Sequence, residues 1–211
     1  MTNRNVRKLP IFVFDMGGVV IKWPGNDPIF TYIARRYRVP VMRMKDAMQN
    51  DLSKVESGEL SCDEYMRASL ERVGRKLEKS DSAGGLIAYP FEKLVKPNQA
   101  TISLIKSLKS KGYHVFALTN TSPPHLEVMK RHGWTLLFDG FFASCELRSI
   151  KPEKKIYLLM LRSIRSKPQD VVFIDDREEN IRGARDAGIS NAILFRSVAS
   201  LKAQISNTIV A

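Results

Sequence analysis

Cysteine is scarce in this chain of 211 residues, which contains only Cys62 and Cys145. The two lie far apart, and no second ligand-like residue is spaced beside either of them. This pattern excludes a disulfide framework and a zinc site of the usual spacing, and it is typical of a protein from a reducing compartment. The sequence also lacks internal repeats and low-complexity tracts.

Long apolar runs are absent as well. No stretch approaches the roughly 20 apolar residues that a membrane-spanning helix needs. Basic residues precede the apolar segment 11–21, as they would in a secretion signal, but Asp15 interrupts that segment and no small-residue cleavage site follows it. We therefore expect a cytoplasmic protein with no membrane partner.

Acidic residues are too few to balance the basic ones. The chain has 34 Lys and Arg against 22 Asp and Glu, which gives a formal net charge of +12. Such a field attracts nucleic acid, anionic lipid or a phosphorylated substrate. Residues 148–167 contribute seven basic residues against one Glu, but the chain has no recognised nucleic-acid motif and little interleaving of aromatic residues. Nucleic acid therefore remains an alternative partner that the sequence does not favour.

Short apolar runs alternate with longer amphipathic segments over most of the chain. Most of the runs are hydrophobic throughout, as expected for parallel strands covered on both faces, and they occupy 11–16, 113–118, 138–144, 170–175 and 191–195. Amphipathic helices are predicted over 98–111, 153–166 and 177–188. This order predicts an α/β fold with a doubly wound, Rossmann-like parallel sheet.

Residues 22–97 break that rhythm. They predict several helices, at roughly 28–38, 41–50 and 61–77, and no strand. So long a segment cannot be a loop, and we interpret it as a small helical domain inserted after the first strand. The predicted domains are an α/β core of residues 1–21 and 98–211 and a helical cap domain of residues 22–97. Trp23, at the start of the insertion, could contact a ligand or anchor packing.

Polar side chains follow the predicted strands at the points where the strands end. Ligands of open parallel sheets bind outside the carboxyl ends of the strands, so we expect these groups to meet at one edge of the sheet. Along the chain the candidates are Asp15, Thr119, Asn120, Lys151, Asp175 and Asp176.

Three carboxylates at one edge repel one another unless a cation lies among them. A bound Mg²⁺ suits oxygen ligands of this kind and commonly works beside a phosphate. Thr119 could donate a hydrogen bond to a phosphoryl oxygen, Lys151 could neutralise another, and Asp15 could attack phosphorus to form an acyl phosphate. Each residue alone also has a structural interpretation, as a helix cap, a turn former or a solvated lysine. The hypothesis therefore depends on their order along the chain.

That order resembles the haloacid dehalogenase (HAD) superfamily over essentially the whole chain. The four motifs that carry the resemblance are FDMGGVV, FALTN, SIKPEKKIY and VFIDDREENIRGARDAGI. The inserted helices resemble the smaller helical cap of that superfamily. A cap of this kind closes over the substrate and excludes water.

The resemblance implies a role for each matching residue. Asp15 would be the nucleophile and a Mg²⁺ ligand, and Asp176 the main acidic ligand, with Asp175 in support. Thr119 and Lys151 would hold the phosphoryl group. The resemblance also implies a metal contact from the backbone carbonyl of Gly17 and substrate contacts from Gly18, Asn120 and His125.

Gly17 departs from the family pattern, because most phosphatases of the superfamily carry a second Asp there that protonates the leaving group. General acid catalysis typically contributes about 10²–10⁴-fold. The first motif and the stretch LTNTSPPHL resemble an α-glucose-1-phosphate phosphatase-like branch. In that branch His125 could hold substrate or supply the missing proton, although His125 is also explained as a polar residue that opens a helix.

We therefore expect a Mg²⁺-dependent phosphatase that hydrolyses a small phosphomonoester, with a sugar phosphate as one candidate, through an aspartyl-phosphate intermediate. One alternative is a catalytically impaired relative that binds phosphorylated ligands or nucleic acid. Another is a 2-haloacid dehalogenase, which also uses an Asp nucleophile but attacks carbon and needs no metal.

Overall fold

The computed structural model describes residues 9–23 and 28–210, with side chains described up to residue 206. Residues 1–8, 24–27 and 211 lie outside this description. It therefore leaves out the basic N-terminal residues and a few residues near the start of the predicted cap. Within the described ranges, no helix is both long and apolar enough to cross a membrane.

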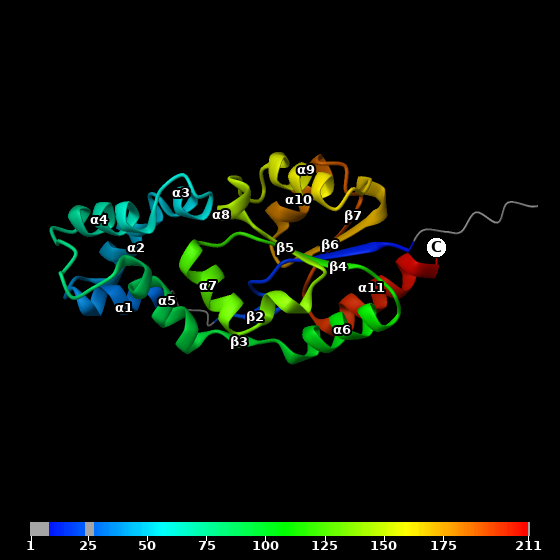
Figure 1. The fold of residues 1–211 in the computed structure, drawn as a ribbon, viewed down its shortest axis with the longest axis horizontal. Coiled ribbons are helices and arrows are strands. Elements are labelled where there is room, and N and C mark those ends of the chain that lie inside the picture. The colour runs from blue at the N-terminus through cyan, green and yellow to red at the C-terminus, as the bar shows by residue number, and fades with distance from the viewer. Residues whose placement is uncertain (1–8, 24–27, 211) are drawn as a thin grey trace, which may run out of the picture.

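A five-stranded parallel sheet forms the centre of the structure, in the spatial order β5, β4, β1, β6, β7 (Figure 1). β1 pairs with β4 on one side and with β6 on the other, and all four of its residues are buried because helices cover both faces of the sheet. The predicted doubly wound α/β fold is confirmed. The strands are β1 (Ile11–Phe14), β4 (Val115–Thr119), β5 (Gly140–Ala143), β6 (Val171–Asp175) and β7 (Asn191–Leu194).

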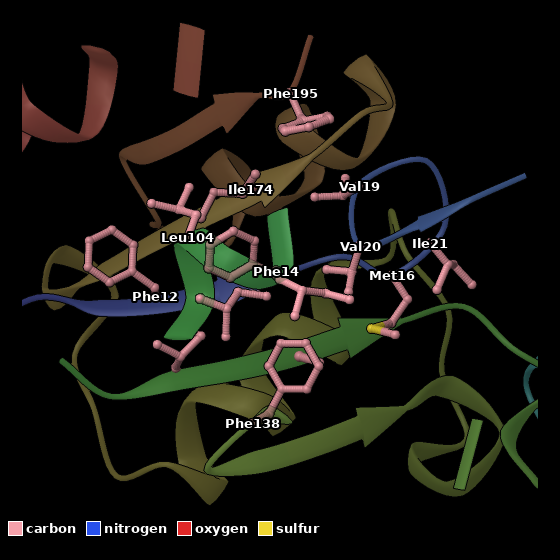
Figure 2. Close-up of a cluster of buried hydrophobic side chains, with 14 of the residues drawn as sticks. Phe12, Phe14, Met16, Val19, Val20, Ile21, Leu104, Phe138, Ile174 and Phe195 are labelled. Carbon is pink, nitrogen blue, oxygen red and sulfur yellow. The ribbon is translucent and has the colours of Figure 1, made fainter. Parts of the chain in front are cut away.

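Alternate residues of β1 pack into two separate cores. Phe12 and Phe14 lie in one core with Leu104 of α6 (Figure 2). The same core holds residues of α11. Ile11 and Val13 lie in the core that holds residues of α9 and α10. The sheet is therefore the middle of three layers. The helices of these layers are α6 (Gln99–Ser110), α9 (Lys154–Ser163), α10 (Glu178–Asp186) and α11 (Val198–Val210). Shorter elements are α7 (Pro123–Arg131), α8 (Ser144–Leu147) and the 3-10 helices η1 (Trp134–Leu137) and η2 (Pro168–Asp170).

Five helices follow β1 along the chain and lie together to one side of the sheet (Figure 1); we call them the cap helices. They bury a core of their own, which includes Ile33, Met44, Tyr65 and Leu70. The division into core and cap domains remains a prediction, and this second core is a physical argument for it. The cap helices are α1 (Pro28–Arg36), α2 (Val41–Gln49), α3 (Leu52–Glu56), α4 (Cys62–Arg72) and α5 (Ala83–Leu94).

The sequence does not predict α5, because residues such as Gly85 and Pro90 disfavour a helix interior. Ser82 stabilises its first turn by accepting a hydrogen bond from the backbone N–H of Gly85 at 3.1 Å. The helix also buries a face that includes Leu86 and Phe91. Packing of that face outweighs the unfavourable residues.

The two segments that join the cap helices to the sheet lie side by side. β2 (Ile21–Lys22) and β3 (Lys96–Pro97) form a short antiparallel pair that the sequence does not predict. Asn98 adds two hydrogen bonds to the incoming segment, one from its side chain to the Val19 carbonyl at 3.1 Å and one from its N–H to the Val20 carbonyl at 2.8 Å. The cap helices therefore begin and end at one place on the core.

A second contact between cap and core lies at α3. The Ser144 hydroxyl donates to the carbonyl of Glu56 at 2.6 Å and accepts from the N–H of Thr121 at 2.9 Å. Gly58 has a φ of +70°, and a Cβ atom there would lie 2.4 Å from the carbonyl oxygen of Cys145. Glycine is needed here both for the left-handed backbone and for the close approach of two chain segments.

Gly58→Ala should destabilise the protein more than the matched control Gly74→Ala. Gly74 has a φ of +72°, but a Cβ there would have no atom of the described residues within 4 Å. Both changes carry the cost of a left-handed residue, about 1–2 kcal/mol, and Gly58→Ala adds an overpacking cost of about 1–3 kcal/mol. Urea unfolding measures the two free energies. Equal losses would contradict the close approach of α3 to α8.

Candidate active site

The predicted residues meet at the carboxyl edge of the sheet. Asp15 directly follows β1, and its N–H donates to the Ile174 carbonyl of β6 at 2.8 Å. Thr119 ends β4 and Asp175 ends β6, while Lys151 lies in the loop before α9. The chain passes from β1 to β4 on one side and later to β6 on the other. Asp15 therefore lies at the switch point of the sheet, where α/β folds bind ligands.

A buried ammonium group links two of the carboxylates. Lys151 Nζ lies 2.6 Å from Asp15 Oδ1 and 2.7 Å from Asp175 Oδ2, and it donates to the Leu118 carbonyl at 3.0 Å. The side chains of Lys151 and Asp175 are 1% and 0% exposed. A charge so deeply buried is tolerated only when it is paired and hydrogen-bonded. These three contacts satisfy all three donors of the ammonium.

The carboxylates hold this ammonium in its charged form. Burial acts to lower the pKa of Lys151, but Asp15 and Asp175 outweigh it and raise that pKa above its usual value. Burial raises the pKa of Asp15 to about 7, against the opposing effect of Lys151. A further positive charge beside Asp15 would favour its carboxylate form.

Two asparagine side chains fix the members of this group in place. Asn120 donates to the backbone carbonyl of Lys151 at 2.9 Å and accepts from its N–H at 2.8 Å. Asn180 Nδ2 lies 3.0 Å from both carboxylate oxygens of Asp175, which also accepts from the N–H of Arg177 at 2.9 Å. The amide of Asn120 is thus engaged with Lys151, while its substrate contact remains a prediction.

Oxygen atoms of Asp15, Asp175 and Asp176 all lie within 4.8 Å of one another. Asp176 is half-buried, and burial together with the charge of Asp175 raises its pKa. Gly18 has a φ of +76°, and a Cβ atom there would lie 2.0 Å from Asp176 Oδ2. Glycine therefore makes room for this carboxylate. An all-oxygen set of this kind fits a hard divalent cation such as Mg²⁺, while the metal contact from Gly17 remains a prediction.

A cavity of about 540 Å³ lies between these residues and the cap helices. Polar residues of the core line one part of it, among them Asp15, Thr119, Lys151 and Asp176. Apolar side chains from the cap helices and the junction line another part, namely Trp23, Phe30, Met48, Leu52, Ile87 and Phe91. Trp23 packs on Phe91, with ring centroids 5.3 Å apart. Trp23 is thus both a packing residue and part of the cavity wall.

His125 lies in α7 and also lines the cavity. Its ring stacks on Phe91 with centroids 4.2 Å apart, and its buried Nε2 atom has no hydrogen-bond partner among the described residues. Burial lowers the pKa of His125 to about 4, although a hydrogen bond to the Ile87 backbone acts in the opposite direction. The ring is therefore neutral near pH 7, which argues against His125 as the proton donor. Its contact with substrate remains a prediction.

Gly17 leaves open the space that a side chain would occupy. A Cβ atom built there would have no atom within 4 Å among the described residues. Gly17 lines the cavity. Where the usual motif has an acidic side chain, this chain therefore has open space.

The sequence interpretation does not single out Glu56, Tyr65 or Arg177, which also line the cavity. Burial raises the pKa of Glu56 to about 7, with Arg177 and Lys151 acting in the opposite direction. No local pattern marks Glu56, because it reaches the cavity only through the packing of α3 against α8.

Comparisons with known proteins agree with this geometry. Residues 9–188 match the haloacid dehalogenase-like hydrolase family. The chain is 26% identical over 193 residues to a sesquiterpene phosphatase of Aspergillus oryzae, covering 89% of this chain and 91% of that protein. It is 24% identical over 184 residues to a D-ribitol-5-phosphate phosphatase of Bacteroides thetaiotaomicron, covering 83% and 87%. It spans only 35% and 26% of the length of two longer relatives.

A solved structure has a similar fold. It is a HAD family enzyme of Bacteroides thetaiotaomicron in complex with magnesium and inorganic phosphate, with a TM-score of 0.74 and 21% identity, covering 90% of this chain and 95% of that one. The family match spans the sheet edge from Asp15 to Asp176 and the cap helices. The chain therefore belongs to the haloacid dehalogenase-like hydrolase family.

Proposed function

We propose that this hydrolase is a Mg²⁺-dependent phosphatase of small phosphomonoesters. The observation that carries the proposal is the buried contact of Lys151 with Asp15 and Asp175, beside a cavity that Thr119 and Asp176 also line. A nucleophile, a fixed positive charge, a hydroxyl donor and acidic oxygens in one site suit phosphoryl transfer. The phosphatases among the relatives, and the magnesium and phosphate in the structural neighbour, support the same reaction class.

In this proposal Asp15 attacks the phosphorus atom, and the bond from phosphorus to the leaving oxygen breaks to give an aspartyl phosphate. Lys151 supplies a fixed positive charge beside the nucleophile, and the Thr119 hydroxyl donates to a phosphoryl oxygen. Water then attacks phosphorus, which releases inorganic phosphate and restores Asp15. Mg²⁺, held by Asp15 and Asp176 with support from Asp175, would neutralise negative charge on the phosphoryl group.

The cavity wall favours a hydrophobic alcohol as the organic part of the substrate. Apolar side chains such as Phe30, Leu52 and Ile87 offer no partners for sugar hydroxyls, and each buried hydroxyl without a partner costs about 1–3 kcal/mol. The cap side of the wall also has the polar residues Gln49, Glu56 and Tyr65. Tyr65 already donates to the Met48 carbonyl at 3.0 Å. The sesquiterpene phosphatase relative supports a hydrophobic substrate, while the D-ribitol-5-phosphate phosphatase supports the sugar-phosphate alternative.

The two other interpretations differ in what they require of the acidic group. A dehalogenase needs no metal, so it does not explain three carboxylates within 4.8 Å of one another. A catalytically impaired relative would bind phosphate or nucleic acid without turnover. Nucleic-acid binding through the basic surplus remains the alternative that the sequence does not favour.

Asp15→Asn should abolish Mg²⁺-dependent hydrolysis of p-nitrophenyl phosphate, because the amide is a much weaker nucleophile. We expect a loss of roughly 10³-fold or more in kcat, and chelator should silence the wild type. Asp139→Asn is the matched control, since Asp139 forms an ion pair with Lys109 and accepts from the N–H of Val115 at the other end of β4. It should stay within about twofold of wild type.

A wild type that is folded but inactive with Mg²⁺ would overturn the phosphatase proposal in favour of a binding function. Halide release from 2-haloacids without metal would favour the dehalogenase.

The rate should rise with the length of the alkyl chain in a series of alkyl phosphates. Each buried methylene contributes about 0.8 kcal/mol, so kcat/KM should increase about fourfold per methylene until the cavity is filled. Trp23→Ala should lower kcat/KM for hexyl phosphate about tenfold and leave methyl phosphate nearly unchanged. Leu136→Ala is the control, because Leu136 is 82% exposed and lies outside the cavity lining. Faster hydrolysis of ribitol or glucose phosphates than of hexyl phosphate would instead support the sugar-phosphate class.

A further inference from the structure

We propose that Glu56 of the cap is the general acid that protonates the leaving oxygen, in place of the acid that is missing at Gly17. This inference rests on the proposed phosphatase function. It concerns protonation of the leaving oxygen, the step for which Gly17 has no acidic side chain. An alkoxide is a poor leaving group unless it receives a proton as its bond to phosphorus breaks.

Three carboxyl groups line the cavity within the described residues. They are those of Asp15, Asp176 and Glu56. Asp15 is assigned as the nucleophile and Asp176 as a metal ligand, which leaves Glu56 as the carboxyl group without an assigned task. His125 is neutral near pH 7, and the hydroxyl of Tyr65 is engaged with the Met48 carbonyl.

The backbone of Glu56 is fixed against the core. Its carbonyl accepts from the Ser144 hydroxyl at 2.6 Å, and Ser144 also accepts from the N–H of Thr121, two residues after Thr119. The close approach of Gly58 to Cys145 fixes the chain on the other side of Glu56. Glu56 belongs to the cap helices, but these contacts hold its backbone in place relative to the loop that follows Thr119.

The surroundings of Glu56 favour the protonated form of its carboxyl group. Burial raises the pKa of Glu56 to about 7, and the charges that act against this are those of Arg177 and Lys151. Helices α2, α4 and α8 pack against α3. Facing the cavity, α4 contributes Tyr65 and α2 contributes the uncharged Gln49. Helix α8 approaches with the backbone of Cys145. A carboxyl group with a pKa near 7 is well matched to give and take a proton at neutral pH.

The proton balance closes over the two half-reactions. As Asp15 attacks phosphorus, the carboxylic acid of Glu56 gives its proton to the departing oxygen, and a neutral alcohol leaves. The Glu56 carboxylate then takes a proton from the attacking water as the bond from phosphorus to Asp15 breaks. Inorganic phosphate is released, and both carboxyl groups return to their starting states.

The test compares two substrates that differ in their need for a proton. p-Nitrophenolate leaves without protonation, whereas the alkoxide of hexyl phosphate does not. Glu56→Gln should lower kcat/KM for hexyl phosphate, which reports the steps up to departure of the alcohol, by roughly 10²-fold or more. It should change kcat/KM for p-nitrophenyl phosphate by less than about threefold. Glu59→Gln is the matched control, because Glu59 is exposed and lies outside the cavity lining. Equal effects of Glu56→Gln on both substrates, or no effect on either, would overturn the assignment.

The pH profile gives a second readout. The acid must be protonated, so hexyl phosphate hydrolysis by wild type should fall as the pH rises through about 7, and this fall should be absent from the residual activity of Glu56→Gln. Infrared difference spectra of wild type against Glu56→Gln should show a carboxylic acid band that titrates in the same range. An unchanged alkaline fall in the variant, or no such band, would contradict the proposal.

A rescue experiment uses the open space at Gly17. Adding Gly17→Asp to Glu56→Gln should restore hexyl phosphate hydrolysis at least about tenfold, because a Cβ at position 17 would have no atom of the described part of the chain within 4 Å. A double variant as slow as Glu56→Gln would overturn the claim that its deficit is a missing proton. Failure of the phosphatase proposal looks different, since the wild type would then hydrolyse neither substrate.

Discussion

One buried ammonium group between two carboxylates is the contact on which the rest of the site depends. Lys151 joins the end of β1, the end of β6 and the loop before α9, which are far apart in the sequence. Loss of one partner of such a buried pair typically costs about 3–5 kcal/mol, because it leaves an uncompensated charge. The same pairing holds Asp15 in one position at the end of β1.

Much of this site was predictable because the sheet itself brings it together. Apolar runs give the strands, and parallel strands present their carboxyl ends at one edge, so Asp15, Thr119 and Asp175 converge by topology. Lys151 was found through its motif. The engagement of Asn120 with the backbone of Lys151 was not predictable, because it depends on the path of a loop.

The cap was predictable only as a helical insertion. α5 contains residues that disfavour a helix, and it forms because its apolar face packs against the neighbouring helices. Glu56 was missed for a related reason: its place beside the cavity follows from contacts between α3 and α8, which no local spacing encodes. Sequence patterns therefore specify the core chemistry more completely than the groups that face it from the cap.

The pairing of β2 with β3 has a consequence for the evolution of the chain. The incoming and outgoing segments meet at a single junction, with Ile21 opposite Pro97. Helices of another number or length could be exchanged at this junction without altering the register of β1 against its neighbours. Remodelling of the substrate-facing wall by insertion, loss or recombination of helices therefore need not displace the residues at the sheet edge.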